Sequence, residues 1–194
     1  MLTSSDFITL LSAVAPFAQP WKSGGKDACK SVLFEFSPES LRLVATDGYI
    51  LAAGEISGAF GFSGSFPVRI TDVDEITRLF NGGPEIILML IASESGVSLT
   101  DGKVTFNAEV LEDVYPDYRP AIENALIESH GCVRLDSDFV ARIIKSSAKI
   151  SGKKGHVDIT TRGETSLVTF VPLIDGAFKT VTSLVYHVMP RRRV

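Results

Sequence analysis

The sequence predicts an α+β fold in which one unit, a helix followed by antiparallel strands, occurs three times. Three segments space their apolar residues three and four positions apart, as amphipathic helices do. They are residues 4–18, 72–81 and 136–151. An acidic residue stands near each helix start, at Asp6, Asp74 and Asp138, and these residues lie 68 and 64 positions apart. Because one such unit cannot cover its own apolar faces, we expect units to pair into domains.

The helix starts carry capping signals. Thr3 with Asp6, and Thr71 with Asp74, have the spacing of a capping box, and the third helix begins with Asp136. On the first helix, the residues that share a face are Phe7, Ile8, Leu11 and Val14. On the third helix, the spacing predicts that four residues are buried: Phe139, Val140, Ile143 and Ile144.

Strand-forming runs follow each helix and are broken by turn signals. Asp47-Gly48 and Asp101-Gly102 predict two-residue hairpins in which both turn residues have positive φ. The turn of the third unit, at residues 162–164, is looser. The expected strands are residues 41–46, 49–56, 97–100, 103–110, 157–161, 165–171 and 183–188.

A proline-containing connector separates the second and third units. Residues 115–129 include Pro116 and Pro120 and have little regular periodicity. We therefore expect one full domain over residues 1–125 and a half domain over residues 126–194.

Composition bounds the class of protein. The chain has 194 residues, 45% of them hydrophobic and 22% charged, which is typical of globular proteins. The net charge of −4 argues against a protein that coats nucleic acid, but it leaves room for a local basic face. Cys29 and Cys132 lack a CxxC spacing, and the longest apolar run, residues 86–92, is too short for a membrane helix. We expect a soluble, cytoplasmic protein with reduced thiols.

Three motifs, taken in their order and spacing, resemble the bacterial DNA polymerase III beta subunit, the sliding clamp family. They are Val44-Ala45-Thr46-Asp47-Gly48, Pro116-Asp117-Tyr118-Arg119 and Tyr186-His187-Val188-Met189-Pro190. Residues 1–125 are similar to the family's central domain, and the rest is similar to the second half of its last domain. The resemblance implies a shortened, non-enzymatic clamp without a cofactor, which tethers a DNA polymerase and other replication proteins to duplex DNA.

The resemblance also implies an assembly. The family's chain has six repeats, whereas three are recognisable here. If family rings contain twelve repeats, four chains would close one ring. An unpaired third unit would expose an apolar helix face and a sheet edge, which invite pairing. We therefore expect a homo-oligomer, either a dimer or a tetrameric ring.

A peptide-binding pocket is the main site that the resemblance implies. In the family, it receives peptides with glutamine and leucine or phenylalanine anchors. One wall would be Thr46, Gly48, Tyr49 and Leu51, and the other Phe139, Leu167, Val188, Met189 and Pro190. Without the resemblance, the hairpin is merely a turn and the last strand merely completes a sheet.

DNA contact is the second implied property, made through phosphates and without sequence specificity. Arg142, Lys145 and Lys149 recur at helical spacing, on the side predicted to face away from Phe139 and Ile143, and Lys153 and Lys154 follow. The first two helices are acidic and would line a ring poorly. The alternative function is therefore a clamp-derived adaptor or decoy, which binds clamp-partner peptides without encircling DNA.

Catalytic signals are weak. His130, His156 and His187 have no metal-like spacing, and His187 alternates with its neighbours on the last strand, so we expect it to face the surface. Asp47 and Asp117 stand in turns, where aspartate is favoured for local hydrogen bonding. The sequence predicts no catalytic residue and no metal site.

Overall fold

A computed structural model describes most of the chain. The described residues are 2–20, 24, 27–81, 87–93, 96–109, 111–120, 135–151, 157–161, 168–172, 174 and 181–188. The helices are α1 (Ser4–Val14), α2 (Ile70–Phe80) and α4 (Ser137–Ser151), with short 3-10 helices η1 (Ala15–Phe17) and η2 (Asp27–Lys30). The strands are β1 (Leu2–Thr3), β2 (Ser31–Phe36), β3 (Ser40–Thr46), β4 (Ile50–Ser57), β5 (Gly64–Arg69), β6 (Ile87–Ser93), β7 (Gly96–Thr100), β8 (Thr105–Glu109), β9 (Val157–Thr161), β10 (Val168–Pro172) and β11 (Val181–Val188).

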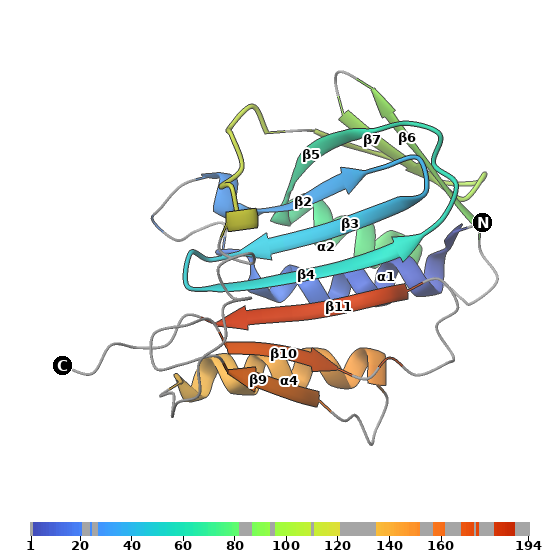
Figure 1. The fold of residues 1–194 in the computed structure, drawn as a ribbon. Coiled ribbons are helices and arrows are strands. Elements are labelled where there is room, and N and C mark those ends of the chain that lie inside the picture. The colour runs from blue at the N-terminus through green and yellow to red at the C-terminus, as the bar shows by residue number, and fades with distance from the viewer. Residues whose placement is uncertain are drawn as a thin grey trace.

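These strands form two antiparallel sheets. One sheet has the order β1-β6-β7-β8, and the other has the order β5-β2-β3-β4-β11-β10-β9. Figure 1 shows the three helices behind the seven-stranded sheet. The predicted α+β class, with a helix and antiparallel strands in each of three units, is confirmed. The long sheet joins the first unit to the third through β4 and β11, with Val188 opposite Ile50 and His187 opposite Leu51.

The Asp-Gly hairpin turns of the first and second units form equivalent hydrogen bonds. The Thr46 hydroxyl donates to the Ile50 carbonyl at 2.8 Å, and the Thr100 hydroxyl donates to the Val104 carbonyl at 2.9 Å. In each turn the aspartate carboxylate accepts two backbone N–H groups, at 3.0 Å in the first and at 2.7 and 2.8 Å in the second. Only the glycines, Gly48 and Gly102, have positive φ. The prediction that both turn residues have positive φ was wrong, because the aspartate side chain holds its own backbone at the strand end.

The helix boundaries differ from the predicted ones for local reasons. Thr3 caps α1 as predicted, and its hydroxyl accepts the Asp6 N–H at 3.1 Å. The helix ends at Val14, before η1, which begins at Ala15 and contains Pro16. The predicted Thr71 cap of the second helix was wrong, because α2 begins at Ile70, continuous with β5, and its N-cap residue makes no side-chain cap bond.

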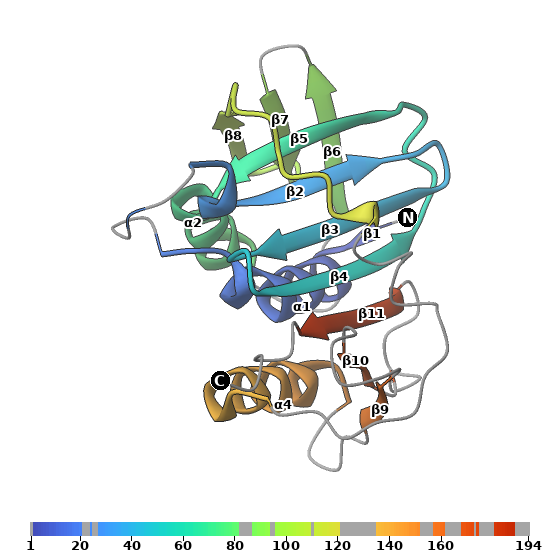
Figure 2. The same cartoon turned by 60° about the vertical axis from the view of Figure 1, so that its left-hand side comes forward.

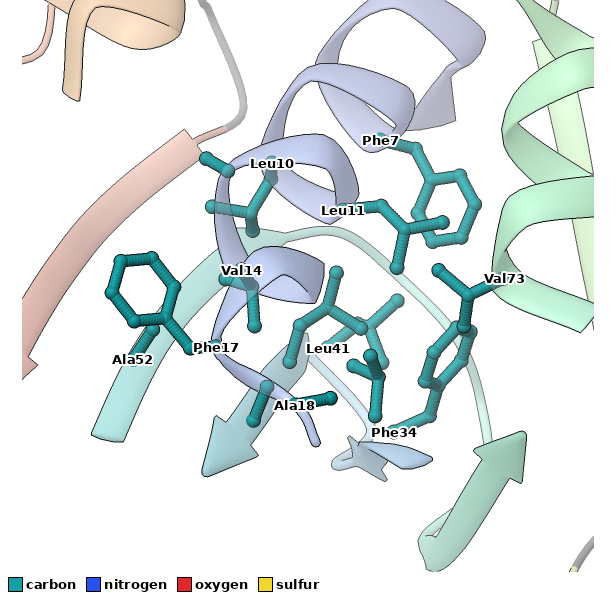
Figure 3. Close-up of a cluster of buried hydrophobic side chains, with 14 of the residues drawn as sticks. Phe7, Leu10, Leu11, Val14, Phe17, Ala18, Phe34, Leu41, Ala52 and Val73 are labelled. Carbon is teal, nitrogen blue, oxygen red and sulfur yellow. The ribbon is translucent and has the colours of Figure 1, made fainter. Parts of the chain in front are cut away.

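The main core lies between α1 and the sheets. Figure 3 shows Phe7, Leu10, Leu11 and Val14 of α1 gathered against Phe34 and Leu41, with Val73 of α2 beside them. Helix α1 buries residues on several sides because it packs against α2, against α4 and against β3 and β4. A helix surrounded in this way is apolar around most of its circumference.

A second, smaller cluster covers the opposite face of the sheet. There Leu33, Val44 and Leu51 pack under Tyr118, which belongs to the strap, defined as residues 111–120. The Tyr118 hydroxyl and the Arg119 guanidinium both donate to the Glu35 carboxylate of β2. The Pro116-Asp117-Tyr118-Arg119 motif therefore fastens the strap to the sheet face away from the helices, which we call the outer face. The domain boundary near residue 125 stays a prediction.

Helix α4 docks on the carboxyl end of α1. The Ser146 hydroxyl donates to the Ala13 carbonyl, and the Lys149 ammonium donates to the Ser12 carbonyl at 2.7 Å. The last carbonyls of a helix lack partners within the helix, so α4 completes the hydrogen bonding of α1. The prediction that Ile144 is buried was wrong: Ile143 is buried, but Ile144 is 59% exposed on the flank of α4 that faces away from α1.

Candidate functional site

The first and third units meet along a seam formed by β4 and β11. The turn at Thr46–Ile50 stands at one end of this seam, beside the last described residue of β11, Val188. The start of α4 reaches the same place from the helix side. Two elements that are far from this turn in the sequence, β11 and α4, therefore meet it at the end of the seam.

Asp47 contacts residues of both the first and the third unit at this end of the seam. Its carboxylate lies 3.3 Å from the Arg142 guanidinium of α4, and its carbonyl accepts the Gln19 side-chain amide at 3.0 Å. The Arg142 guanidinium also lies over two rings, 5.1 Å from the centre of Phe139 and 6.0 Å from that of Phe17. The prediction that Arg142 faces away from Phe139 was wrong, because the buried rings and Asp47 together attract the cation.

The predicted pocket residues occupy different surroundings. Gly48 is exposed and Tyr49 is 68% exposed, whereas Thr46 is buried within the turn. Phe139 is half-buried beneath Arg142. Leu51 and Val188 lie on opposite faces of the sheet, because Leu51 packs under Tyr118 and Val188 belongs to the core on the helix side. Leu167, Met189 and Pro190 lie outside the described residues.

A groove of about 190 Å³ follows the seam on the outer face. Its floor comes from β4 and β11, and the Tyr118 ring and the Arg42 side chain border it. The lining residues are Arg42, Ala53, Gly54, Tyr118, Ser183, Val185 and His187. This volume is below that of pockets for drug-sized ligands and suits a single anchoring side chain.

His187 lies on the outer face, where its side chain lines the groove. Its predicted surface position was wrong, because it is only 7% exposed where β11 is flanked on both sides by strands. The Thr169 hydroxyl lies 3.1 Å from His187 Nδ1. Burial lowers the pKa of His187 to about 4, so the imidazole is neutral near pH 7. Burial also raises the pKa of Tyr118 to about 12, with Glu35 as a further cause.

The predicted basic residues do not form one continuous surface. Arg142 is engaged with Asp47, and Lys149 bonds to the end of α1, where burial and the nearby Lys145 lower its pKa. Lys145 is exposed. On α2, the Arg78 guanidinium is paired with Glu75. Lys153 and Lys154 lie outside the described residues.

Two general features can be stated for the described part of the chain. It contains no group of three or more His, Cys, Asp or Glu side chains that could hold a metal ion. Its helices are too short or too polar to cross a membrane.

Sequence comparison connects this architecture to a family. The chain is 32% identical over 121 residues to the beta sliding clamp of Caulobacter vibrioides, an alignment that covers 60% of this chain and 31% of that protein. It is 32% identical over 130 residues to the beta sliding clamp of Escherichia coli K12, covering 65% of this chain and 35% of that protein. Over the aligned residues the chain is similar to beta sliding clamps. No family model matches it.

Solved structures show that the chain has the fold of DNA polymerase III beta subunits. The DNA polymerase III beta subunit of Thermotoga maritima superposes with a TM-score of 0.78 at 17% identity, covering 100% of this chain and 65% of that one. The subunit of Pseudomonas aeruginosa gives 0.79 at 13% identity, covering 99% and 65%. Another Pseudomonas aeruginosa clamp was solved bound to griselimycin. The matches thus span about a third of the curated relatives and about two thirds of these solved chains.

Three residues at the seam were not predicted from the sequence. Asp47 was interpreted only as a turn residue, although one carboxylate oxygen, Oδ1, bonds to its own turn and the other, Oδ2, contacts Arg142 of α4. Gln19 and Phe17 gave no signal, because nothing in their local pattern predicts contact with Asp47, 28 positions from Gln19, or with Arg142 and Tyr186, more than a hundred positions from Phe17. The nearest hint was the i, i+3 spacing of Phe139 and Arg142, which puts both on one side of a helix.

Proposed function

We propose that this protein is a sliding-clamp-type processivity factor that docks peptides of replication proteins at the seam between its first and third units. The proposal is supported mainly by one observation. The Thr46–Ile50 turn, the end of β11 and the start of α4 meet around Asp47 and Arg142. The exposed Tyr49 and the outer-face groove beside Leu51 offer apolar surface next to hydrogen-bonding groups. Mixed surfaces of this kind bind peptide anchors.

The arrangement favours docking and not chemistry. The aspartate at the seam is held by an arginine and by two backbone N–H groups of its own turn. The histidine at the seam is buried and neutral near pH 7. We therefore propose a protein without catalytic activity, in which the seam acts as a rigid receptor for an extended ligand.

Peptide binding tests this proposal. We expect a fluorescent peptide with a glutamine anchor and a leucine or phenylalanine anchor to bind the full chain in an anisotropy titration. Tyr49→Ala should weaken binding at least tenfold, because a large exposed ring is lost from the turn. Ala53→Leu should also weaken binding, because it fills part of the groove. Ile91→Ala, an exposed residue of the other sheet, is the control. Equal affinity in all four proteins would refute the site.

Tethering to DNA is the second part of the proposal. Non-specific contact with phosphates would come from Lys145 and Lys149, together with the predicted Lys153 and Lys154. We expect retention on nicked circular DNA in a mobility assay and its loss when the circle is linearised, since a ring slides off free ends. Lys145→Glu should reduce retention, and raising the salt concentration should reduce it further.

One observation favours a second candidate, a clamp-derived adaptor that binds peptides without encircling DNA. Helix α2 carries Asp72, Asp74 and Glu75 at its surface, its arginine is paired with Glu75, and α1 has no basic residue. Such a surface repels phosphates. If the peptide binds but neither circular nor linear DNA is retained, the adaptor is the correct function.

A further inference from the structure

The strap borders a second, larger groove on the outer face. Its first residue, Leu111, donates its backbone N–H to the Pro67 carbonyl of β5 at 3.0 Å. Farther along, Tyr118 and Arg119 both bond to Glu35 of β2. Figure 2 shows the strap, in yellow, crossing β5 and β2. A groove of about 490 Å³, which we call the strap groove, lies between the strap and these two strands. It is lined by Leu33, Glu35, Ser65 and Pro67 of the sheet and by residues 111–119 of the strap.

The strap groove contains an open strand edge. Strand β5 is the last strand at one side of the seven-stranded sheet. In an antiparallel strand, the N–H and C=O of one residue point to the same side, and those of the next residue point to the other side. The Pro67 carbonyl points away from β2, because it accepts the Leu111 N–H. Ser65, two residues earlier, therefore also directs its N–H and C=O away from β2. Ser65 is exposed, and among the described residues none bonds to its backbone from this side.

The strap groove also carries an excess of negative charge. The strap contributes three exposed acidic residues, Glu112, Asp113 and Asp117. The basic residue of the lining is Arg119, and its guanidinium is paired with the Glu35 carboxylate. Three carboxylates of the lining therefore have no basic partner within the described lining. A surface of this kind attracts cationic groups and repels the phosphates of nucleic acids.

The opposite face of the open edge is apolar. Phe66 follows Ser65 along β5, and successive side chains of a strand point to opposite faces of the sheet. The Phe66 ring is half-buried, and its centre lies 5.9 Å from that of Phe36. A segment paired with this edge would therefore place alternate side chains beside the carboxylates of the strap and beside Phe66.

We propose that the strap groove binds an extended basic segment of a partner protein, which pairs with the open edge of β5. The basic side chains of the segment face the strap carboxylates, and its alternate, apolar side chains pack beside Phe66. Pairing with a sheet edge supplies affinity through main-chain hydrogen bonds, and the carboxylates select the charge of the partner. This site is separate from the groove at the seam, because Ser65, Glu112 and Asp113 do not line that groove.

Anisotropy titrations of the full chain test this proposal. A short fluorescent peptide in which lysine and valine alternate should bind, and the same peptide with glutamate in place of lysine should not. Asp113→Lys should weaken binding of the lysine peptide by about tenfold, because attraction becomes repulsion. Asp158→Lys is the matched control, since Asp158 is an exposed acidic residue on β9, the opposite edge of the same sheet. It should leave the affinity unchanged. Equal affinity for the two peptides, or equal affinity in the two variants, would overturn the proposal.

Hydrogen exchange of the wild-type chain tests the strand pairing and needs no variant. The Ser65 amide should exchange more slowly when the lysine peptide is bound, because its N–H then donates to the peptide. The Asp158 amide on the opposite edge should be unaffected. Unchanged exchange at Ser65 with saturating peptide would show that the edge is not engaged and would refute the pairing. The peptide with glutamine and leucine anchors should not compete with the lysine peptide. Competition would mean one shared site at the seam, and the strap groove would then not be a separate one.

Discussion

Replacing Phe17 with alanine is expected to lower the free energy of unfolding by about 3–5 kcal/mol, the usual cost of removing a buried ring. Phe17 is fully buried, and its ring centre lies 4.9 Å from that of Tyr186 on β11. The Arg142 guanidinium of α4 also lies over the Phe17 ring, 6.0 Å from the ring centre. One side chain of the first unit therefore contacts two elements of the third unit, and its loss leaves a cavity between them.

Hydrogen exchange distinguishes this effect from general destabilisation. In Phe17→Ala we expect the amides of β9, β10 and β11 to lose more protection than those of β2 and β3, because the third unit loses part of its docking surface. Phe80→Ala removes a ring of similar burial from α2, which does not belong to the seam. It should lower stability without this selective loss. If the two variants lose protection in the same pattern, Phe17 has no special role at the seam.

Replacing His187 with glutamine is expected to remove a large part of the acid sensitivity of the fold. Burial lowers the pKa of His187 from 6.5 to about 4. Between these values the unfolded chain binds a proton that the folded chain does not, so stability rises with pH across this window and falls as pH drops from about 6.5 to 4. A shift of this size corresponds to about 3 kcal/mol.

Urea unfolding at several pH values from 4 to 8 measures this effect. The wild-type chain should lose about 3 kcal/mol more than His187→Gln between pH 7 and pH 4, because glutamine keeps a hydrogen-bonding group toward Thr169 but does not titrate. The other charged and titratable groups of the groove, Arg42 with its partner Glu55 and Tyr118, are the same in both proteins. Parallel pH curves for the two proteins would contradict the assignment.

Local patterns in the sequence located the three helices and seven of the strands, whereas β1, β2, β5 and β6 were not predicted. The Thr3 cap, the helical spacing of residues 137–151 and the strand at Val157–Thr161 all depend on residues close together in the chain, and all are present in the structure. The two Asp-Gly hairpins were located correctly, although the backbone of each turn differs from the predicted one. The resemblance added the clamp fold, which the solved structures confirm.

The candidate site depended on information that the local pattern lacks. His187 alternates with Tyr186 and Val188, and this pattern predicts one exposed face when a sheet has solvent on one side. The prediction failed because His187 lies in a groove that the Tyr118 ring of the strap and the Arg42 side chain border. Arg142 was assigned to the basic side of a helix, yet Asp47 and two rings from other elements draw it to the seam.

The sequence by itself determined the three helices, most of the strands and the resemblance to sliding clamps, because these follow from spacing and from short motifs. Only the tertiary structure decided which unit pairs with which. The joining of β4 to β11 places His187 in the groove and brings Arg142 of α4 to Asp47. Pairing of strands more than a hundred residues apart depends on the complementarity of whole surfaces, which no local pattern contains.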